Sequence, residues 1–197
     1  MNQLLIATAN LGKLREIRAL LEDTCIKLLT PGDFNLVLDV EEDGLTYAEN
    51  AARKAQAYSI ASGILTLGDD SGLEVDVLNG APGIYSARYA PQVGATDADR
   101  RAYLLQQLSP YPSPWIARFN CTVALASPDG DMHFAHGICP GEIIPEERGV
   151  NGFGYDPIFL LTEMGRTMAE LTMNEKNLLS HRARALLAIK PVILSLL

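Results

Sequence analysis

Two adjacent carboxylates, Asp69 and Asp70, lie between glycines in the segment 68–72, directly after the apolar run 63–67. Adjacent acids repel each other, so a fold that keeps them beside a buried strand usually needs a cation or a shifted pKa to hold them. A divalent metal ion at such a place would bring phosphate oxygens and water together. We therefore expect a metal-binding turn at the end of a strand, although Asp and Gly also mark turns that only face solvent.

A second candidate site is the segment 8–13 (TANLGK), which joins a short apolar run to a helical pattern. Helix N-termini present unpaired N–H groups and partial positive charge, and small residues let the backbone approach an anion. The segment is not a Walker A loop, because only Gly12 and Lys13 fit and Leu14 stands where Ser or Thr should bind Mg²⁺. It favours a phosphate-binding loop, and a plain strand-to-helix connection is the alternative.

The acidic run 41–44 (EEDG) precedes a predicted helix and could supply an oxygen ligand to a metal ion at Asp70. Such runs are also common on solvated faces. On the helix that follows, Arg53 and Lys54 lie two turns beyond Thr46. One of these two cations can point toward a bound anion while the other stays in water, and the sequence does not choose between them.

In residues 149–157 (GVNGFGYDP), glycines flank an aromatic residue and precede a carboxylate. Glycine on both sides lets the ring of Phe153 lie flat against a planar ligand, and stacking on a nucleic-acid base contributes about 1–3 kcal/mol. Asp156 could accept hydrogen bonds from the N–H groups of such a ring. The alternative is an irregular loop in which Phe153 or Tyr155 fills the core.

Basic and polar residues gather again near the C-terminus, in the segment 172–182. Lys176 and Ser180 are one helical turn apart, so they can share a face. Arg182 carries a fixed fork of donors suited to carbonyl or phosphate oxygens, and His181 can donate or accept according to its tautomer.

Composition excludes several classes of protein. The chain has 197 residues, of which 48% are hydrophobic and 20% charged, as in an ordinary globular protein. Its net charge of -8 argues against binding to DNA or RNA backbones. The three cysteines have no C-x-x-C spacing and indicate core thiols in a reducing compartment. Neither a signal peptide nor a membrane span is predicted, so we expect a cytoplasmic protein.

The elements that must position these residues alternate between short apolar runs and helical patterns, which predicts an α/β fold. Thr46 and Glu49 form a predicted capping box at the start of one helix. The proline-rich stretch 109–114 is the expected lobe boundary of a single two-lobed domain, 1–197, whose second lobe adds antiparallel strands. Strands are expected at 4–7, 26–29, 64–67, 115–126 and 132–138, and helices at 12–21, 46–62, 96–108 and 174–189.

Taken together and in this order, the segments resemble the inosine triphosphate pyrophosphatase family, whose members are also described as XTP/dITP diphosphatases. One departure is Ala9, where the family usually has glycine, and the extra methyl group could crowd the phosphates. The matching signatures extend over nearly the whole chain and occupy 8–13, 41–51, 69–73, 80–89, 152–157 and 180–182.

The resemblance implies Mg²⁺-dependent hydrolysis of non-standard purine nucleoside triphosphates (ITP, dITP and XTP) to the monophosphate and pyrophosphate. It also implies a long mixed β-sheet flanked by helices, two lobes around a substrate cleft, and a homodimer. Asp70 would be the catalytic base and, with Glu41, a ligand of Mg²⁺. The implied substrate contacts are Thr8, Ala9, Asn10, Leu11, Gly12, Lys13, Lys54, Ser71, Phe153, Gly154, Tyr155, Asp156, Lys176, His181 and Arg182.

Within this implied set, three groups of residues have different roles. Polar residues of the segment 8–13, together with Lys54 and Lys176, would hold the triphosphate. Phe153 would stack on the purine, and the side chains that would read the edge of the ring are Asp156, His181 and Arg182. The competing interpretations are a metal-dependent nucleotide phosphatase that releases inorganic phosphate and a nucleotide-binding module without catalysis.

Overall fold

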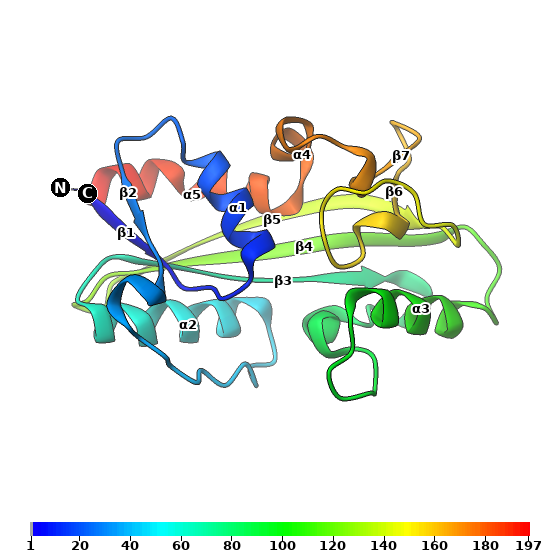
Figure 1. The fold of residues 1–197 in the computed structure, drawn as a ribbon, viewed down its shortest axis with the longest axis horizontal. Coiled ribbons are helices and arrows are strands. Elements are labelled where there is room, and N and C mark those ends of the chain that lie inside the picture. Colours follow the sequence, from blue (N-terminus) through cyan, green and yellow to red (C-terminus); the bar gives the residue numbers. More distant parts are fainter. Residues whose placement is uncertain (1) are drawn as a thin grey trace. The chain divides into compact units, whose positions relative to one another are not determined.

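The computed structural model describes residues 2–197 and contains a mixed seven-stranded β-sheet in the order β2-β1-β3-β4-β5-β6-β7 (Figure 1). β1 pairs in parallel with β2 and β3, whereas β5, β6 and β7 pair in antiparallel fashion. The predicted α/β class and mixed sheet are therefore confirmed. The strands are β1 Gln3–Ile6, β2 Lys27–Leu29, β3 Thr66–Val75, β4 Trp115–Ala126, β5 Met132–Ile143, β6 Phe159–Leu161 and β7 Arg166–Thr167.

The first two α-helices begin where the sequence offers a capping side chain. Asn10 caps the first helix, and Thr46 caps the second by accepting a hydrogen bond from the backbone N–H of Glu49. The predicted capping box is incomplete, because the Glu49 carboxylate accepts from Leu45 instead of from Thr46. The α-helices are α1 Leu11–Leu20, α2 Tyr47–Ser62, α3 Asp97–Leu108, α4 Met173–Leu179 and α5 His181–Leu196.

The chain divides into two compact units, each built from several segments. Unit 1 contains the chain up to Asp70 together with 121–137 and 181–197, and unit 2 contains 71–120 and 138–180. The proline-rich stretch 109–114, where we expected a lobe boundary, lies inside unit 2 and connects α3 to β4. The division instead falls within strands, because β3, β4 and β5 each continue from one unit into the other.

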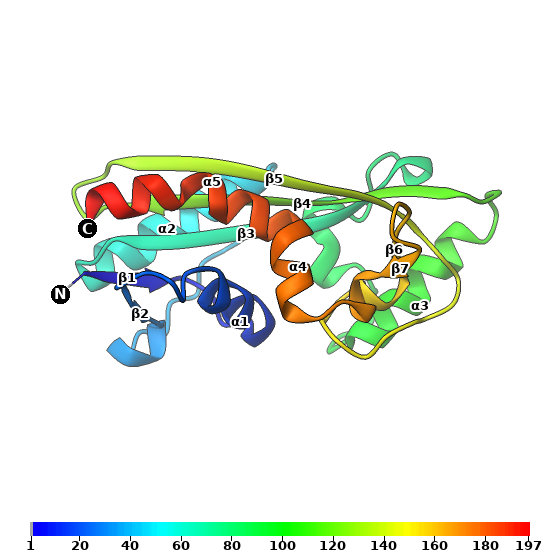
Figure 2. The same cartoon turned by 90° about the horizontal axis from the view of Figure 1, so that it is seen from above.

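Unit 1 has helices on both faces of its part of the sheet (Figure 1). On one face, α1 and α5 share a buried core that includes Ile6, Ile17 and Leu186. On the other face, α2 packs through small residues such as Ala51 and Ala55, which cluster with alanines of β4. Figure 2 shows α5 running alongside β5. A sheet covered on both faces can bury side chains of every position along a strand.

The strand β3 differs most from the sequence-based expectation. We expected the strand to stop at Leu67 and the acids to lie on a turn, but β3 continues through Asp69 and Asp70 to Val75. Asp69 and Asp70 are only 2% and 5% exposed. The expectation of a turn was wrong because the apolar run ends at Leu67, whereas the strand continues. The acids can be buried in the strand because cations from other segments pair with them.

Unit 2 buries a second core in which α3 contributes Leu104 and Leu108 and the strands contribute Phe119 and Phe159. The two phenylalanine rings lie 4.3 Å apart between centroids. The tilted packing of such rings adds to the burial of apolar surface. This core therefore fixes α3 against the strands of unit 2.

The single helix expected at 174–189 is two helices, α4 and α5. Ser180 takes an extended backbone conformation (φ -66°, ψ 155°) that ends α4, and His181 begins α5. The apolar residues on each side of Ser180 keep a helical spacing, so the sequence pattern does not reveal this break.

We expected core thiols, but the three cysteines are not all in the core. Cys121 and Cys139 are buried, and burial raises the pKa of Cys121 to about 12. Cys25 is exposed. The expectation of core thiols therefore holds for two of the three cysteines.

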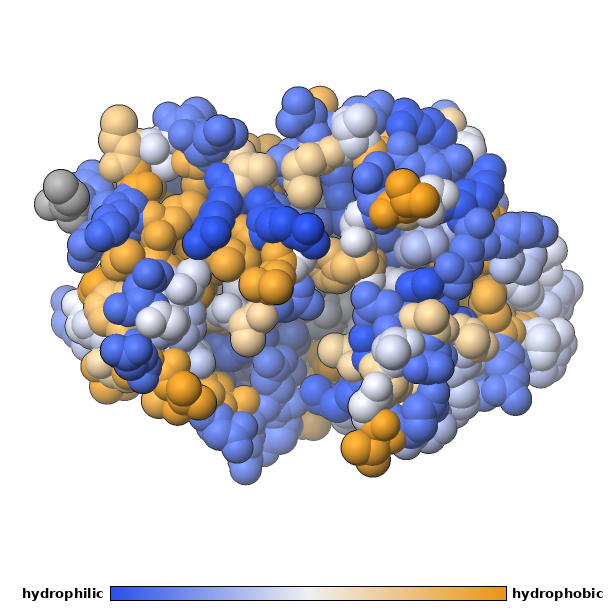
Figure 3. Space-filling view, in the orientation of Figure 1, coloured by the Kyte–Doolittle hydropathy of each residue, from blue (hydrophilic) through white to orange (hydrophobic). Residues whose placement is uncertain are grey.

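Among residues 2–197, no helix is both long enough and apolar enough to cross a membrane. The face drawn in Figure 3 has hydrophilic and hydrophobic residues interspersed.

The contact between β3 and α2 leads to a testable prediction. A Cβ atom at Gly68 would lie 2.5 Å from the carbonyl oxygen of Ala51 and 2.9 Å from the nitrogen of Ala55. We expect Gly68→Ala to lower the free energy of unfolding by about 1–3 kcal/mol, because the added methyl group forces the helix away from the strand. Urea unfolding measures the effect. In the control Gly32→Ala, the new atom would lie 3.7 Å from its nearest neighbour, Thr30, so equal losses in both variants would contradict the prediction.

Candidate functional site

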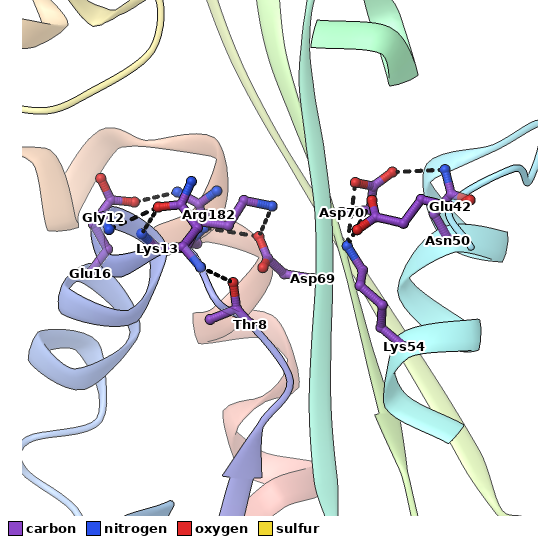
Figure 4. Close-up of polar contacts among 11 residues, drawn as sticks. Thr8, Gly12, Lys13, Glu16, Glu42, Asn50, Lys54, Asp69, Asp70 and Arg182 are labelled. Atoms are coloured by element: carbon purple, nitrogen blue, oxygen red, sulfur yellow. Dashed lines mark hydrogen bonds and ion pairs between the residues drawn. The ribbon is translucent and has the colours of Figure 1, made fainter. Parts of the chain in front are cut away.

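The neighbouring acids of β3 point in opposite directions. Successive side chains of a β-strand lie on opposite faces of the sheet. Asp69 therefore faces α1 and α5, whereas Asp70 faces α2 (Figure 4). The two carboxylates do not form one cluster, so the repulsion that we inferred from their adjacency is relieved by the strand itself. Asp69 forms ion pairs with Lys13 and Arg182, and Asp70 forms one with Lys54.

Asp69 belongs to a buried network of four charges in unit 1. Its Oδ2 atom lies 3.1 Å from Lys13 Nζ and 3.1 Å from Arg182 Nε. Arg182 also forms an ion pair with Glu16, and these two side chains are 1% and 3% exposed. Two positive and two negative charges thus neutralise each other in the interior, which a buried ionic group requires.

The pKa values of this network follow from its contacts. Burial acts to raise the pKa of Asp69, but Lys13 and Arg182 outweigh it and hold the pKa well below its usual range. Burial acts to lower the pKa of Arg182, but Glu16 and Asp69 outweigh it and the pKa is raised. Both groups therefore stay ionised, and Lys13 is held by a fully charged partner.

Glu16 was missed by the sequence-based reasoning, which considered Asp69 only as part of a metal-binding turn. Glu16 lies three positions after Lys13 on α1, a spacing that places two side chains on one face of a helix and could have indicated Glu16 as a neighbour of the phosphate-binding candidate. No local pattern indicates the partner Arg182, which is 113 positions away from Asp69.

The segment 8–13 forms the connection from β1 into α1, as expected. The Oδ1 atom of Asn10 accepts hydrogen bonds from the N–H groups of Gly12 (2.8 Å) and Lys13 (3.1 Å), and Thr8 accepts from Asn10 (3.1 Å). Asn10 therefore satisfies two of the N–H groups that we expected to be open to an anion. The side chain of Lys13 is 15% exposed and supplies the full positive charge of the segment.

Ala9 fits this segment without strain. It is exposed, and the non-glycine residues with positive φ among residues 2–197 are Asn35 and Asn79. The backbone at position 9 thus does not need glycine, and the methyl group does not distort the loop.

Asp70 lies in a second arrangement of unit 1, formed with α2 and the loop before it (Figure 4). Its Oδ2 accepts a hydrogen bond from Asn50 Nδ2 (3.2 Å), and its Oδ1 lies 3.6 Å from Lys54 Nζ. Lys54 is also 3.1 Å from Glu42. Burial raises the pKa of Asp70 above its usual value, although Lys54 and Lys13 act against this.

The structure resolves the choice between the two cations of α2. Lys54 points to Asp70, and its side chain is 11% exposed. Arg53 forms an ion pair with Asp43 on the surface, where both side chains are about half exposed or more (47% and 66%).

Asn50 connects the two acidic segments. Its Nδ2 donates to Asp70, while its Oδ1 accepts from the N–H of Gly44 (2.8 Å), at the end of the acidic loop. The side chain is fully buried. One amide group therefore fixes both the carboxylate of Asp70 and the position of the loop.

The residues around Asp70 fit the ligand preferences of Mg²⁺. This ion is usually bound through one or two carboxylates together with waters and substrate phosphates. The acid that shares Lys54 with Asp70 is Glu42, whereas Glu41, the residue implied by the resemblance, is exposed on the same loop. Among residues 2–197, no group of three or more His, Cys, Asp and Glu side chains could hold a metal ion.

Unit 2 holds the aromatic part of the predicted site. Asp156 Oδ2 accepts a hydrogen bond from the N–H of Phe153 (2.9 Å) and lies 2.5 Å from Lys176 Nζ. The ammonium group of Lys176 is 5.0 Å from the centre of the Phe153 ring, a cation–π distance. Lys176 therefore lies with the aromatic residue, whereas the resemblance assigned it to the phosphates.

Phe153 and Tyr155 have different environments. Tyr155 is buried and donates a hydrogen bond to the carbonyl of Ser86 (2.9 Å), so its side chain fills the core of unit 2. Phe153 is partly exposed. The flanking Gly152 and Gly154 have φ values of 80° and 61°, which other residues rarely adopt. In the aromatic loop, the ring of Phe153 is therefore partly accessible to solvent, whereas the ring of Tyr155 is buried.

Helix α3 fixes the aromatic loop through a backbone contact that the sequence did not reveal. The N–H of Gly154 donates to Asp97 (2.8 Å), and its carbonyl accepts from Arg101 (2.9 Å). Arg101 is in turn paired with Glu147 at 2.8 Å. Both polar groups of one glycine are thus satisfied by a neighbouring helix.

Three further residues of the predicted site lie on β3, α5 and α1. Ser71 is a partly buried residue of β3. His181 begins α5 and is 5% exposed, next to Arg182. Leu11 begins α1 and is 72% exposed.

The buried network around Asp69 predicts a large loss of stability in Asp69→Asn. At pH 7 we expect the free energy of unfolding to fall by about 3–5 kcal/mol, because Arg182 and Lys13 lose a buried partner. The pKa of Asp69 is lowered from 3.8 in the folded protein, so its contribution is complete above pH 3.8 and declines as the pH falls further. Urea unfolding at several pH values should show the deficit narrowing below pH 3.8.

The control for this measurement is Asp39→Asn, which changes an exposed carboxylate of the same unit. A deficit of less than 1 kcal/mol in Asp69→Asn at pH 7, or one equal to that of the control, would contradict the role of the network.

The amino-acid sequence from residue 4 to residue 192 matches the Ham1 family. A protein of Geobacter sulfurreducens named dITP/XTP pyrophosphatase is 47% identical over 191 residues, which are 96% of each chain. A protein of the same name from Shouchella clausii is 45% identical over 196 residues, 98% of this chain and 97% of the relative.

Solved structures give the same result. The HAM1 protein from Coxiella burnetii has a TM-score of 0.89 at 42% identity, covering 99% of this chain and 100% of that protein. The Ham1 protein of Staphylococcus aureus has a TM-score of 0.86 at 35% identity, covering 100% of both chains. Because sequence and fold agree over nearly their full length, this chain belongs to the Ham1 family.

Proposed function

We propose that the protein hydrolyses non-standard purine nucleoside triphosphates such as dITP, XTP and ITP to the nucleoside monophosphate and pyrophosphate. The observation that carries the proposal is Asp70, a buried carboxylate with a raised pKa that lies beside Lys54 and Asn50. Perturbed acids of this kind are typical of catalytic sites. The relatives named dITP/XTP pyrophosphatase support the reaction and the class of substrate.

In the proposed reaction, Asp70 orients the attacking water and accepts its proton as the water attacks the α-phosphorus. Its raised pKa makes it a better proton acceptor than an ordinary exposed aspartate, while the charge of Lys54 keeps it ionised. The bond from the α-phosphorus to the bridging oxygen breaks, and pyrophosphate leaves. Lys13 and Lys54 stabilise the negative charge that moves onto the leaving group.

We propose that Asp70 binds Mg²⁺ together with an acid of the loop before α2. Glu42 is supported by its contact with Lys54, and Glu41 by the family resemblance. Mg²⁺ bound there would withdraw charge from the phosphate oxygens and lower the pKa of the attacking water. The net charge of this acidic protein makes such local neutralisation necessary for a substrate with about four negative charges.

We propose that the residues of unit 2 around Phe153 bind the base. Phe153 stacks on the purine, and Lys176 donates a hydrogen bond to a ring oxygen while Asp156 holds it in place. Adenine carries an amino group where hypoxanthine and xanthine carry the 6-oxo group, so it would leave this donor unpaired. Sites that depend on such a bond can discriminate by about 10⁴-fold. We propose that His181 also contacts the purine.

The contacts of Arg182 support a different role from the one that the resemblance implies. Its guanidinium is buried against Asp69 and Glu16. We propose that it holds Asp69, and through Asp69 the phosphate-binding Lys13, in place. The proposal further includes a cytoplasmic homodimer, as the resemblance implies.

The experiment that tests the reaction is product analysis with a panel of purine nucleoside triphosphates and Mg²⁺. Release of pyrophosphate from dITP, XTP or ITP, with little from ATP, supports the proposal. Release of inorganic phosphate alone would instead identify the nucleotide phosphatase, and binding without turnover would identify a nucleotide-binding module.

We predict that Asp70→Asn lowers kcat by at least about 10²-fold while the protein still binds nucleotide, because the amide can neither accept the proton nor bind the metal ion as a carboxylate does. Pyrophosphate release measures turnover, and calorimetry measures binding. Asp39→Asn serves as the control for the loss of one negative charge. Turnover near that of the wild type would refute the role of Asp70.

We predict that Phe153→Ala raises KM by roughly 5- to 100-fold, because it removes about 1–3 kcal/mol of stacking on the base. The value of kcat should change much less, since the ring does not touch the reacting atoms. Phe153→Tyr keeps the aromatic face and should retain a KM near that of the wild type. An unchanged KM in Phe153→Ala would contradict the proposal that this ring stacks on the base.

A further inference from the structure

Lys54 lies between two carboxylates. Its Nζ atom is 3.1 Å from Glu42 and 3.6 Å from Asp70, and the lysine side chain is only 11% exposed. The two acids come from different segments, a loop and β3, and Lys54 belongs to α2 (Figure 4). The single positive charge of Lys54 therefore neutralises part of the combined negative charge of Glu42 and Asp70.

We infer that Lys54 is an internal counterion that gives way when a divalent cation binds between Asp70 and Glu42, and that its released ammonium group then binds the phosphates of the nucleotide. The inference rests on the proposed function and deepens it, because it couples metal binding to nucleotide binding through one side chain. Like charges of the lysine and the metal ion cannot both remain close to the same carboxylate oxygens.

The chemistry of lysine suits this exchange. Its ammonium is a compact point charge on a flexible four-carbon stem, so it can change partners without movement of the backbone. The helix beneath it stays fixed, because α2 packs directly on Gly68 of β3. Lys54 can thus turn from the acids to a phosphate while its Cα atom remains in place.

Asp70 and the backbone of the acidic loop have a contact that remains when the lysine leaves. Asn50 is fully buried and bonds both Asp70 and the N–H of Gly44, which ends the acidic loop. This amide carries no charge, so a bound cation does not repel it. The Asp70 carboxylate and the backbone of the acidic loop therefore keep contacts that do not depend on Lys54.

Two consequences follow for binding. Without nucleotide, Lys54 competes with the metal ion, so metal affinity is weak. With nucleotide, the phosphates give Lys54 a second partner, and metal affinity rises. Coupling of this kind is reciprocal, so the metal ion must strengthen nucleotide binding by the same factor.

The test is calorimetric titration of the nucleotide-free protein with Mn²⁺, used as a probe for the Mg²⁺ site. We expect Lys54→Met to bind Mn²⁺ roughly tenfold more tightly than the wild type, because the competing positive charge is removed. A role of Lys54 limited to packing predicts no such gain. Lys54→Arg restores the charge and should return the affinity to the wild-type range.

The matched control is Arg53→Met, which removes a positive charge from the neighbouring position. Arg53 is paired with Asp43 on the surface, whereas Lys54 is paired with Asp70. We expect its Mn²⁺ affinity to equal that of the wild type. Unchanged or weaker binding in Lys54→Met, or an equal gain in Arg53→Met, would overturn the inference.

A second titration measures the coupling itself. In the presence of the α,β-methylene analogue of ITP, Mn²⁺ affinity should rise in the wild type and not in Lys54→Met. Circular dichroism checks that each variant is folded, and Lys54→Gln replaces Lys54→Met if that variant does not fold. Pyrophosphate release by the wild type separates the two proposals: hydrolysis without coupling overturns only the inference, whereas no hydrolysis overturns the proposed function.

Discussion

The alternation of side chains along β3 is the constraint on which the candidate site depends. Adjacent residues of a strand face opposite sides of a sheet, and in unit 1 helices cover both sides. Asp69 therefore meets Lys13 and Arg182, whereas Asp70 meets Lys54. Two carboxylates that are neighbours in the chain acquire opposite pKa shifts, lowered for Asp69 and raised for Asp70. Asp69 is a permanent charge that holds cations, and Asp70 is the proposed catalytic base.

Charge pairing also explains how an acidic protein can be built to receive an anion. The chain carries a net charge of -8, yet its phosphate-facing candidates, Lys13 and Lys54, are each held by a carboxylate. Buried ion pairs add little net stability, but removing one partner is costly, so they fix geometry more than they strengthen the fold. Lys13, which Asp69 holds in this way, is in place before a ligand arrives, which lowers the entropic cost of binding.

Much of the local structure was predictable from the sequence. The connection of β1 to α1 and the start of α2 follow from Asn10 and Thr46, because a capping side chain acts within three residues of its own position. The end of β3 was not predictable in this way. Asp69 and Asp70 are polar, and their burial depends on cations from distant segments. The break at Ser180 was missed because helical spacing continues on both sides of it.

The sequence by itself determined the family resemblance, the α/β class and which polar residues were candidates for chemistry, because these follow from residue types and short spacings. Only the tertiary structure decided their partners. It assigned Lys54 instead of Arg53 to Asp70, brought Glu42 to the same lysine, placed Lys176 beside Phe153, and joined Arg182 to Asp69 across 113 positions of the chain. Such pairs form because the packing of helices on a sheet brings distant segments together, and no local spacing encodes that contact.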